Sequence, residues 1–389
     1  MKKASLELAQ KTETEKNSFL KELASILKKN KKYILEENRH DLEKAREQNL
    51  SDVFLQRLTI DEKGINDLVI KVLEMQHLDA GIGEIIEQKI VGDGLLLHKI
   101  RVPIGVIAII YEARPEVTVD VAALCIKSGN VAILKGGSEA MHTNIILYKC
   151  ILKALKKTGF RKETINFITS TDRKNVLELL TRSDLIDLVI ARGSYAMVEN
   201  IQKHSSIPVL AHSAGGARIY IDKSADLSIV EKIIINAKVT KPSACNSLNT
   251  IIIHKELMGT FLKAICKSLT QQGVALVKND WTTEFLDMRV SIKVVADATA
   301  AIKFINKYGN AHSEGIIASD PAVIALATSQ VDTAALFINC SPRLHDGYVF
   351  GLGSEMGIAT GKLHASGPVG LKELTIYKWI AYGKGHIRE

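Results

Sequence analysis

Short runs rich in β-branched residues alternate with helix-like stretches from Val102 onward, and this alternation restricts the fold more than any other feature of the chain. The first series of runs covers residues 105–110, 131–134, 165–168, 185–190 and 208–210. The stretches between these runs suit crossover helices, which connect parallel strands of one sheet. We therefore predict an α/β domain with a mostly parallel sheet and helices on both faces.

A second alternating series begins near Leu227 and predicts a second α/β domain. Its expected strands are residues 248–254, 289–295, 315–319 and 335–339, and its expected helices end near 239 or cover 255–272 and 297–307. Residues 5–77 carry apolar side chains at helical spacing, which predicts a helical region ahead of both series. Outside the two series, residues 86–100 predict a hairpin with Gly92 and Gly94 at its turn, and residues 375–382 predict a terminal strand.

The charge of the chain restricts the class of ligand. A formal charge of +8 and a pI near 9.0 suit anionic ligands such as phosphorylated metabolites and dinucleotides, and they also suit nucleic acid. The densest lysine cluster, Lys28, Lys29, Lys31 and Lys32, closes a helix-like run, where cations favour the helix dipole. Only 5% of the residues are aromatic, which leaves few stacking platforms for single strands. We therefore expect a small anionic ligand and no nucleic acid.

The cellular location and the metal content are inferred from absent patterns. The N-terminus turns polar before a signal-peptide core can form, and no stretch reaches about 18 apolar residues, so neither export nor membrane insertion is expected. Five cysteines without a CxxC pair indicate a reducing compartment, with the cytoplasm as the default. The histidines show no metal-ligand spacing, and no metal is expected.

Cys245 is the strongest candidate for a catalytic residue. It lies in Lys-Pro-Ser-Ala-Cys-Asn-Ser, a polar break between a helix-like run that ends near Val239 and a strand-like run at residues 250–253. Backbone amides and Lys241 near such a thiol favour the reactive thiolate. Cys340 also has polar neighbours, but it closes a strand-like run and is a weaker candidate. The remaining cysteines, Cys125, Cys150 and Cys266, lie in apolar runs where packing explains them.

Two junctions between a predicted strand and a predicted helix are candidate phosphate sites. In the first, a strand ends in Lys135, and Gly136 and Gly137 precede a helix that Ser138 is expected to cap. Glycines permit close backbone approach, the helix N-terminus attracts anions and the lysine adds a charge, so an adenosine ribose phosphate fits here. Gly193 and Ser194 form the second junction and suit a pyrophosphate. At both junctions an ordinary connection between strand and helix is the alternative.

Arg114 follows a predicted buried strand and precedes a proline suited to helix entry. Its guanidinium could bind a carboxylate or a phosphate through two parallel hydrogen bonds. Ion pairing with Glu112 or Glu116 is the competing interpretation. Glycine-rich segments from Gly351 to Gly357 and from Gly357 to Lys362 imitate a dinucleotide fingerprint and a P-loop, but their spacing is wrong for both.

Seven sequence blocks occur in an order that is typical of one family. They are Arg101-Val-Pro-Ile-Gly-Val, Tyr111-Glu-Ala-Arg-Pro, Lys127-Ser-Gly-Asn-Val-Ala-Ile-Leu-Lys-Gly-Gly-Ser-Glu-Ala, Pro242-Ser-Ala-Cys-Asn, Trp281-Thr-Thr-Glu-Phe-Leu-Asp, Asp346-Gly-Tyr-Val-Phe-Gly-Leu-Gly-Ser-Glu-Met-Gly-Ile and Gly367-Pro-Val-Gly-Leu. Over nearly its whole length the chain resembles the gamma-glutamyl phosphate reductases, a branch of the aldehyde dehydrogenase superfamily. The resemblance implies NADPH-dependent reduction of L-glutamyl 5-phosphate to L-glutamate 5-semialdehyde, with release of phosphate, in proline biosynthesis.

The resemblance also implies a domain plan and an assembly. We expect an aldehyde-dehydrogenase-like fold with two parallel-sheet domains and a small oligomerisation hairpin. Residues 1–228 are assigned to a cofactor-binding domain with residues 86–103 as the hairpin, and residues 229–350 to a catalytic domain that carries Cys245. Residues 351–389 are expected to return to the cofactor domain and end in an oligomerisation strand. A homo-oligomer, either dimer or tetramer, and functional coupling to a glutamate 5-kinase are further expectations.

Roles for individual residues follow from the resemblance. Cys245 matches the family's nucleophile, and Asn246 is expected to help hold the oxyanion. The positions expected to bind NADPH or NADP are Lys135 and Ser138 near the adenosine ribose, Gly193 and Ser194 near the pyrophosphate and Glu284 at the nicotinamide ribose. The residues expected to bind substrate are Arg114, Ser243, Arg343 and His345.

The chain departs from the family pattern in several segments, including residues 211–216 and 339–344, and three of the differing positions concern substrate affinity. Pro342 stands where threonine is usual, Ser366 stands where arginine is usual, and Asn249 stands where glutamate is common. Loss of an arginine near a site for a doubly anionic substrate leaves alternatives open. These are a related acyl reductase with another acyl donor such as acyl-CoA, a cysteine hydrolase or acyltransferase without a nicotinamide cofactor, and a binding protein without catalysis.

Overall fold

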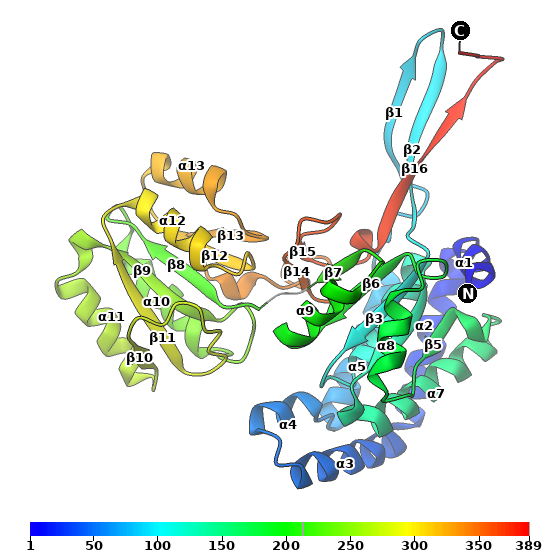
Figure 1. Cartoon of the computed structure of the whole chain (residues 1–389), viewed down its shortest axis with the longest axis horizontal. Coiled ribbons are helices and arrows are strands. Elements are labelled where there is room, and N and C mark those ends of the chain that lie inside the picture. The colour runs from blue at the N-terminus through cyan, green and yellow to red at the C-terminus, as the bar shows by residue number, and fades with distance from the viewer. Residues whose placement is uncertain (212–213, 389) are drawn as a thin grey trace. The chain divides into compact units, whose positions relative to one another are not determined.

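A computed structural model describes residues 1–211 and 214–388 of the chain, which forms two compact units (Figure 1). The first unit comprises Met1–Ala211, Gly351–Gly357 and Val369–Glu389, and the second comprises His212–Phe350 and Ile358–Pro368. Each unit is built around a parallel sheet, so the predicted α/β fold class is confirmed.

The central sheet of the first unit has the strand order β5-β4-β3-β6-β7, with all neighbouring strands parallel. Its strands are β3 (Val106–Tyr111), β4 (Val131–Gly136), β5 (Ile165–Phe167), β6 (Leu188–Arg192) and β7 (Val209–Ala211). The chain moves outward from β3 to β5 and then continues on the other side of β3, so the strand order reverses between β3 and β6. Open α/β sheets bind ligands at the carboxyl ends of their strands at such a reversal.

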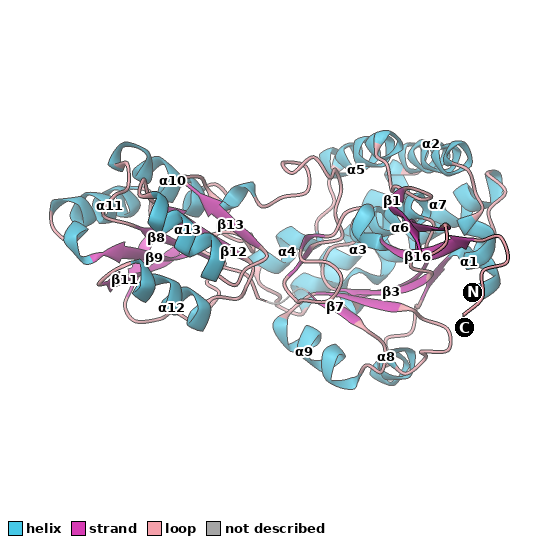
Figure 2. Cartoon of the chain, turned by 90° about the horizontal axis from the view of Figure 1, so that it is seen from above, coloured by secondary structure: helices cyan, strands magenta, loops and turns pink. Residues whose placement is uncertain are grey.

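Helices cover both faces of this sheet (Figure 2). α6 (Val117–Ser128) and α7 (Met141–Lys157) lie on one face, and α8 (Arg173–Leu180) and α9 (Tyr195–His204) lie on the other. The N-terminal helices are α1 (Lys2–Ala9), α2 (Glu13–Lys29), α3 (Lys31–Glu47), α4 (Asp52–Leu58) and α5 (Glu62–Glu74). A capping box of Thr12 and Glu15 starts α2, and Lys28 and Lys29 lie in its last turn, so the lysine cluster is a helix end as predicted.

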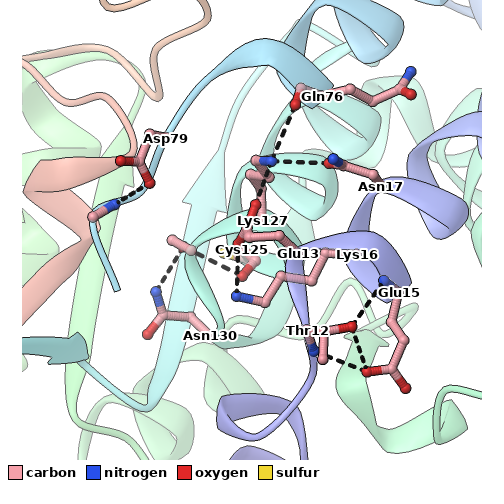
Figure 3. A network of polar contacts seen from close by, with 12 residues as sticks. Thr12, Glu13, Glu15, Lys16, Asn17, Gln76, Asp79, Cys125, Lys127 and Asn130 are labelled. Atoms are coloured by element: carbon pink, nitrogen blue, oxygen red, sulfur yellow. Dashed lines mark hydrogen bonds and ion pairs between the residues drawn. The ribbon is translucent and has the colours of Figure 1, made fainter. Parts of the chain in front are cut away.

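A buried lysine joins α6 to the N-terminal helices (Figure 3). Lys127 is 1% exposed. Its Nζ donates to Glu13 Oε2 at 2.5 Å, to Asn17 Oδ1 at 2.9 Å and to the Gln76 carbonyl at 3.3 Å. These acceptors come from α2 and from the short 3-10 helix η1 (Met75–His77). Because a buried ammonium needs such partners, the network stabilises the contact of α2 and η1 with α6.

The predicted hairpin and terminal strand form one antiparallel sheet in the first unit (Figure 1). β1 (Ile85–Val91) pairs with β2 (Leu95–Pro103), and β16 (Thr375–Tyr382) pairs with the other edge of β2. Both strand predictions are confirmed. Several large apolar side chains of this sheet are exposed, namely Ile85, Ile86, Ile90, Ile376, Tyr377, Trp379 and Tyr382. The sheet therefore presents an apolar surface of the kind that mediates association.

The sheet of the second unit has the strand order β10-β11-β9-β8-β12-β13 and is also parallel. Its strands are β8 (Ala217–Ile221), β9 (Leu248–His254), β10 (Ala275–Val277), β11 (Arg289–Val295), β12 (Ser313–Ile317) and β13 (Ala335–Ile338), and its helices are α10 (Leu227–Val239), α11 (Thr260–Gln271), α12 (Ala298–Tyr308) and α13 (Pro321–Gln330). Ile251 and Ile253 pack with residues of α10 and α11, whereas Ile252 packs with residues of α12 and α13 on the opposite face of the sheet.

The boundary between the units lies earlier in the chain than predicted. β8 pairs with β9 and β12 of the second sheet, so residues 214–228 belong to the second unit and not to a domain of residues 1–228. The predicted return of residues 351–389 to the first unit is also incomplete. Ile358–Pro368 belongs to the second unit, where β14 (Ile358–Ala359) pairs with β15 (Gly367–Pro368).

Candidate active site

Cys245 lies in the turn between α10 and β9, as predicted. Two backbone hydrogen bonds shape this turn: the Ala244 N–H donates to the Lys241 carbonyl at 3.1 Å, and the Ser247 N–H donates to the Ala244 carbonyl at 2.9 Å. The Cys245 thiol and the neighbouring Ser243 are half-buried. The turn therefore presents a partly accessible thiol among backbone amides.

The other four cysteines are poor nucleophiles because burial raises the pKa values of their thiols. Burial raises the pKa of Cys150 to about 11, and it also raises the pKa values of Cys125, Cys266 and Cys340. These thiols remain protonated near neutral pH, whereas the thiolate is the nucleophilic form. Packing accounts for Cys125 and Cys150, which are fully buried in α6 and α7.

Arg343 places a positive charge near Cys245 within the second unit. Burial lowers the pKa of Arg343, while the negative charges of Cys245 and Asp346 act in the opposite direction. This attraction is mutual, so the guanidinium favours the thiolate form of Cys245. Arg343 lies in the short 3-10 helix η5 (Pro342–Leu344), where its N–H donates to Ser341 Oγ at 3.3 Å.

Two glycines contact the backbone of Cys245. The Gly216 N–H donates to the Cys245 carbonyl oxygen at 2.6 Å. A Cβ added to Gly215 would lie 2.2 Å from the same oxygen, so this approach requires glycine. The Gly215 N–H donates to Glu284 Oε1 at 2.9 Å. One dipeptide thus links the candidate nucleophile to the residue expected at the nicotinamide ribose.

Asn246 and His345 meet beneath the same turn. Asn246 is 5% exposed, and its Nδ2 donates to the His345 carbonyl at 3.0 Å. The His345 ring is buried at 1% exposure, and its Nδ1 shares a hydrogen bond of 2.7 Å with Ser313 Oγ. The His345 carbonyl orients Asn246. The expected contact of His345 with substrate remains a prediction.

In the first unit, two expected cofactor residues follow β6 at the reversal of strand order. Ser194 precedes α9, and its N–H donates to Glu112 Oε2 at 2.7 Å. A Cβ on Gly193 would lie 2.6 Å from the same carboxylate oxygen. The junction therefore holds an anionic oxygen from the protein itself, at the position where a pyrophosphate was expected.

The junction after β4 differs from the prediction. Ser138 does not cap α7, because a 3-10 turn, η2 (Ser138–Ala140), separates it from the helix. Buried Asp41 from α3 accepts the N–H groups of His142 at 3.1 Å and Thr143 at 2.8 Å instead. Lys135 is 7% exposed, and its Nζ donates to the Gly136 carbonyl at 2.7 Å. This hydrogen bond uses one of the three donors of the ammonium group.

Arg114 lies near Arg192 at the end of β6, and no ion pair within 4.0 Å joins it to Glu112 or Glu116 in the described part of the chain. Burial lowers the pKa of Arg192, and the charge of Arg114 lowers it further, while Asp120, Glu116 and Glu355 raise it. Two guanidinium groups near one another favour an anionic partner. The proposed anion-binding role of Arg114 remains a prediction.

Asp120, whose carboxyl group interacts with Arg192, leads to a prediction about how the stability of the fold depends on pH. Burial raises its pKa from 3.8 to about 6, with Glu116 adding to the shift and Lys71 and Arg192 opposing it. The folded state then binds more protons than the unfolded state between about pH 4 and 6, so the carboxyl group lowers stability as pH rises through this window. Above about pH 6, Asp120→Asn should therefore have a free energy of unfolding up to about 3 kcal/mol higher than that of the wild type.

Urea unfolding followed by circular dichroism at several pH values measures this difference. Asp67→Asn, at an exposed position of α5, is the matched control and should show no such pH dependence. A constant difference between Asp120→Asn and the wild type from about pH 4 to 8 would contradict the assignment.

Along the described residues, no helix combines the length and the apolar character needed to cross a membrane. The same residues contain no group of three or more histidine, cysteine, aspartate or glutamate side chains placed to hold a metal ion.

Comparison with known proteins identifies the family. The aldehyde dehydrogenase family model matches residues 1–283. The gamma-glutamyl phosphate reductase of Thermodesulfovibrio yellowstonii is 40% identical over 390 residues, covering 96% of this chain and 93% of that protein. That of Dictyoglomus turgidum is 41% identical over 404 residues, covering 100% of this chain and 97% of that protein. The chain belongs to the gamma-glutamyl phosphate reductases of the aldehyde dehydrogenase family.

Solved structures agree with this family. The gamma-glutamyl phosphate reductase of Thermotoga maritima matches with a TM-score of 0.96 at 38% identity, covering 100% of this chain and 98% of that one. An acetylating aldehyde dehydrogenase of Geobacillus thermoglucosidasius matches with a TM-score of 0.72 at 14% identity, covering 100% of this chain and 96% of that one. The second likeness shows the fold alone, which is shared within the aldehyde dehydrogenase family.

The departures from the gamma-glutamyl phosphate reductase pattern have different structural settings. Pro342 occupies the first position of η5, where a missing N–H costs no hydrogen bond, and Arg343 keeps its place near Cys245. Ser366 is exposed. Asn249 is 3% exposed in β9, close to Gly216. Reasoning from sequence missed the roles of Gly215 and Gly216, for which adjacent glycines were the available signal.

Proposed function

We propose that this reductase catalyses the NADPH-dependent reduction of L-glutamyl 5-phosphate to L-glutamate 5-semialdehyde and phosphate, the second step of proline biosynthesis from glutamate. The observation that carries the proposal is the setting of Cys245. A half-buried thiol lies near Arg343 in a turn of backbone amides, in a chain about 40% identical to curated gamma-glutamyl phosphate reductases.

In this mechanism the Cys245 thiolate attacks the carbonyl carbon of the acyl phosphate. Backbone N–H groups of the turn and the Asn246 amide stabilise the negative charge on the carbonyl oxygen. The bond from carbon to the phosphate oxygen breaks, and phosphate leaves with the electron pair, which forms a thioester on Cys245. Bound NADPH supplies the hydride that reduces this thioester. Cleavage of the carbon–sulfur bond then releases the aldehyde and restores the thiolate near Arg343.

The substrate carries a phosphate and an α-carboxylate, so its site needs cations. Arg343 is the first candidate because its charge already interacts with Cys245. Ser243 lies two residues before the nucleophile and offers a hydroxyl donor. Arg114 is a further candidate for binding an anionic group.

The residues proposed to bind the dinucleotide are Lys135, Ser138, Gly193, Ser194 and Glu284. Their fit can be judged at Ser194, whose N–H already binds an anionic oxygen of Glu112 at 2.7 Å. A phosphate oxygen has the charge and the acceptor capacity to take this position. We propose NADPH as the natural cofactor because Lys135 adds a cation near the expected ribose phosphate.

Glu112 leads to a prediction about cofactor affinity. The Glu112 carboxylate accepts the hydrogen bond of the Ser194 N–H, and its negative charge would repel a bound pyrophosphate. Glu112→Gln should therefore lower the Kd for NADPH by about 3- to 10-fold. Fluorescence titration of NADPH at constant ionic strength measures the effect. Glu199→Gln, at an exposed position on α9, is the matched control and should leave the Kd within about 2-fold. A rise in Kd for Glu112→Gln would show that Glu112 contacts the cofactor favourably.

The reverse reaction distinguishes the proposed activity from its alternatives. Glutamate 5-semialdehyde and NADP should give NADPH only when inorganic phosphate is present, because phosphate is the acyl acceptor. Formation of NADPH with coenzyme A in place of phosphate would identify an acyl-CoA reductase. Absence of saturable NADPH binding would point to a cysteine hydrolase, an acyltransferase or a binding protein without catalysis.

The proposed assembly rests on the sheet of β1, β2 and β16. We propose that its exposed apolar side chains are covered in a homo-oligomer, and light scattering of a Trp379→Lys variant tests this by the loss of the oligomer. The lability of an acyl phosphate favours functional coupling to a glutamate 5-kinase. A cytoplasmic location agrees with five free cysteines.

A further inference from the structure

The side chain of Asn249 forms hydrogen bonds with the backbone of both neighbours of Glu284, Thr283 and Phe285. Asn249 lies in β9 at 3% exposure. The Asn249 Nδ2 donates to the Thr283 carbonyl at 2.5 Å, and the Phe285 N–H donates to Asn249 Oδ1 at 3.4 Å. One amide therefore holds the backbone immediately before and immediately after Glu284.

The same amide packs against the dipeptide that contacts Cys245. Gly216 has φ of +96°, and a Cβ added there would lie 2.8 Å from Asn249 Nδ2. The neighbouring Gly215 N–H donates to Glu284 Oε1 at 2.9 Å. Asn249 thus contacts both segments that meet at the Glu284 carboxylate.

Arg218 joins these two segments a second time. It is 0% exposed, and its Nη1 donates to the Gly216 carbonyl at 2.8 Å while its Nη2 donates to the Trp281 carbonyl at 3.2 Å. A buried brace of this kind limits the movement of the segment at residues 281–285 relative to Gly216. Any further movement of the Glu284 backbone depends on Thr283 and Phe285, whose backbone groups are hydrogen-bonded to Asn249.

Asparagine suits this place better than a carboxylate. An amide both donates and accepts hydrogen bonds, whereas an ionised carboxylate only accepts. A buried carboxylate here would face the Thr283 carbonyl oxygen without a proton to share. The departure at Asn249 is therefore matched to its two backbone partners.

We propose that Asn249 is a positioning residue for Glu284: its amide fixes the backbone on both sides of Glu284 and thereby sets the carboxylate that contacts the nicotinamide ribose. This inference rests on the cofactor role proposed for Glu284. It assigns to Asn249 an effect on cofactor binding, although Asn249 itself is buried beneath the segment.

A double-mutant cycle tests the proposal through NADPH binding in the absence of substrate. Asn249→Ala should raise the Kd for NADPH at least 5-fold in the wild-type background and less than 2-fold in the Glu284→Ala background. The rate at which iodoacetamide alkylates Cys245 without cofactor should stay within 2-fold. These fold-changes in Kd are of the size that is usual for two residues coupled through direct contacts.

Thr250→Val is the matched control, because it removes one buried hydrogen bond of the same strand, between Thr250 Oγ1 and Ser291 Oγ at 2.9 Å. It should leave the Kd for NADPH within 2-fold. Equal effects of Asn249→Ala in both backgrounds, an unchanged Kd, or an unchanged Kd in Glu284→Ala itself would each overturn the inference. Normal NADPH binding without turnover of glutamyl phosphate would count against the proposed substrate and leave the inference standing.

Discussion

Cys245→Ser is expected to lower kcat for glutamyl phosphate reduction by about 10³-fold or more. A serine hydroxyl stays protonated at neutral pH, so Arg343 cannot produce a useful nucleophile from it. The hydroxyl also forms an ester in place of the thioester, and an ester accepts hydride less readily. NADPH oxidation with freshly generated glutamyl phosphate measures kcat, and the Kd for NADPH should remain near the wild-type value.

Cys266→Ser provides the matched control for this loss of activity. Burial raises the pKa of Cys266, and its side chain lies on α11, so kcat should stay within about 2-fold of the wild type. Retention of most activity by Cys245→Ser would remove the thioester from the mechanism. Loss of activity by Cys266→Ser would show that the assay responds to general damage.

Much of the α/β architecture could be predicted because buried parallel strands leave a direct mark on the sequence. The runs that became β3, β4, β9 and β11 are rich in isoleucine and valine, because helices cover both of their faces. The hairpin was also visible, since its turn uses Gly92 and Gly94 at positive φ. These features are local, so a single stretch of sequence is enough to reveal them.

The strand β8 was missed because a charge lies inside it. Arg218 is 0% exposed, and its N–H and guanidinium meet Glu314, which lies 96 residues later in the chain. A strand with a charged residue at its second position resembles an edge or a loop in sequence. Its burial depends on the pairing with Glu314 and on hydrogen bonds to the Gly216 and Trp281 carbonyls, and none of these partners is visible before the fold is known.

In the candidate site, too, features set by local sequence could be predicted, whereas features set by contacts between distant segments could not. Cys245 was predictable from its local setting between a helix and a strand. The cap of α7 was predicted wrongly, because Asp41 from a distant helix takes the role expected of Ser138. The positions of Glu284 and Asn249 also depend on contacts between segments far apart in the chain. Such contacts are set by tertiary structure, which local propensity does not report.

Gly215 is the position where a small change should have the second large effect on activity. A Cβ there would lie 2.2 Å from the Cys245 carbonyl oxygen and 2.7 Å from its Cα. Real Cβ atoms do not approach backbone so closely, so the turn that carries Cys245 or the segment of Gly215 must move. The hydrogen bond from the Gly216 N–H to Cys245 would be lost with that movement.

Gly215→Ala should therefore lower kcat by about 100-fold, since a displacement of about 1 Å at a nucleophile costs roughly this factor. The rate of Cys245 alkylation should change in the same variant, because the thiol moves relative to Arg343. Gly361→Ala is the matched control in the same unit: a Cβ there meets no atom within 4 Å, so kcat should stay within about 2-fold. Equal activity in the two variants would mean that the turn tolerates a methyl group and that the glycine contact does not position the nucleophile.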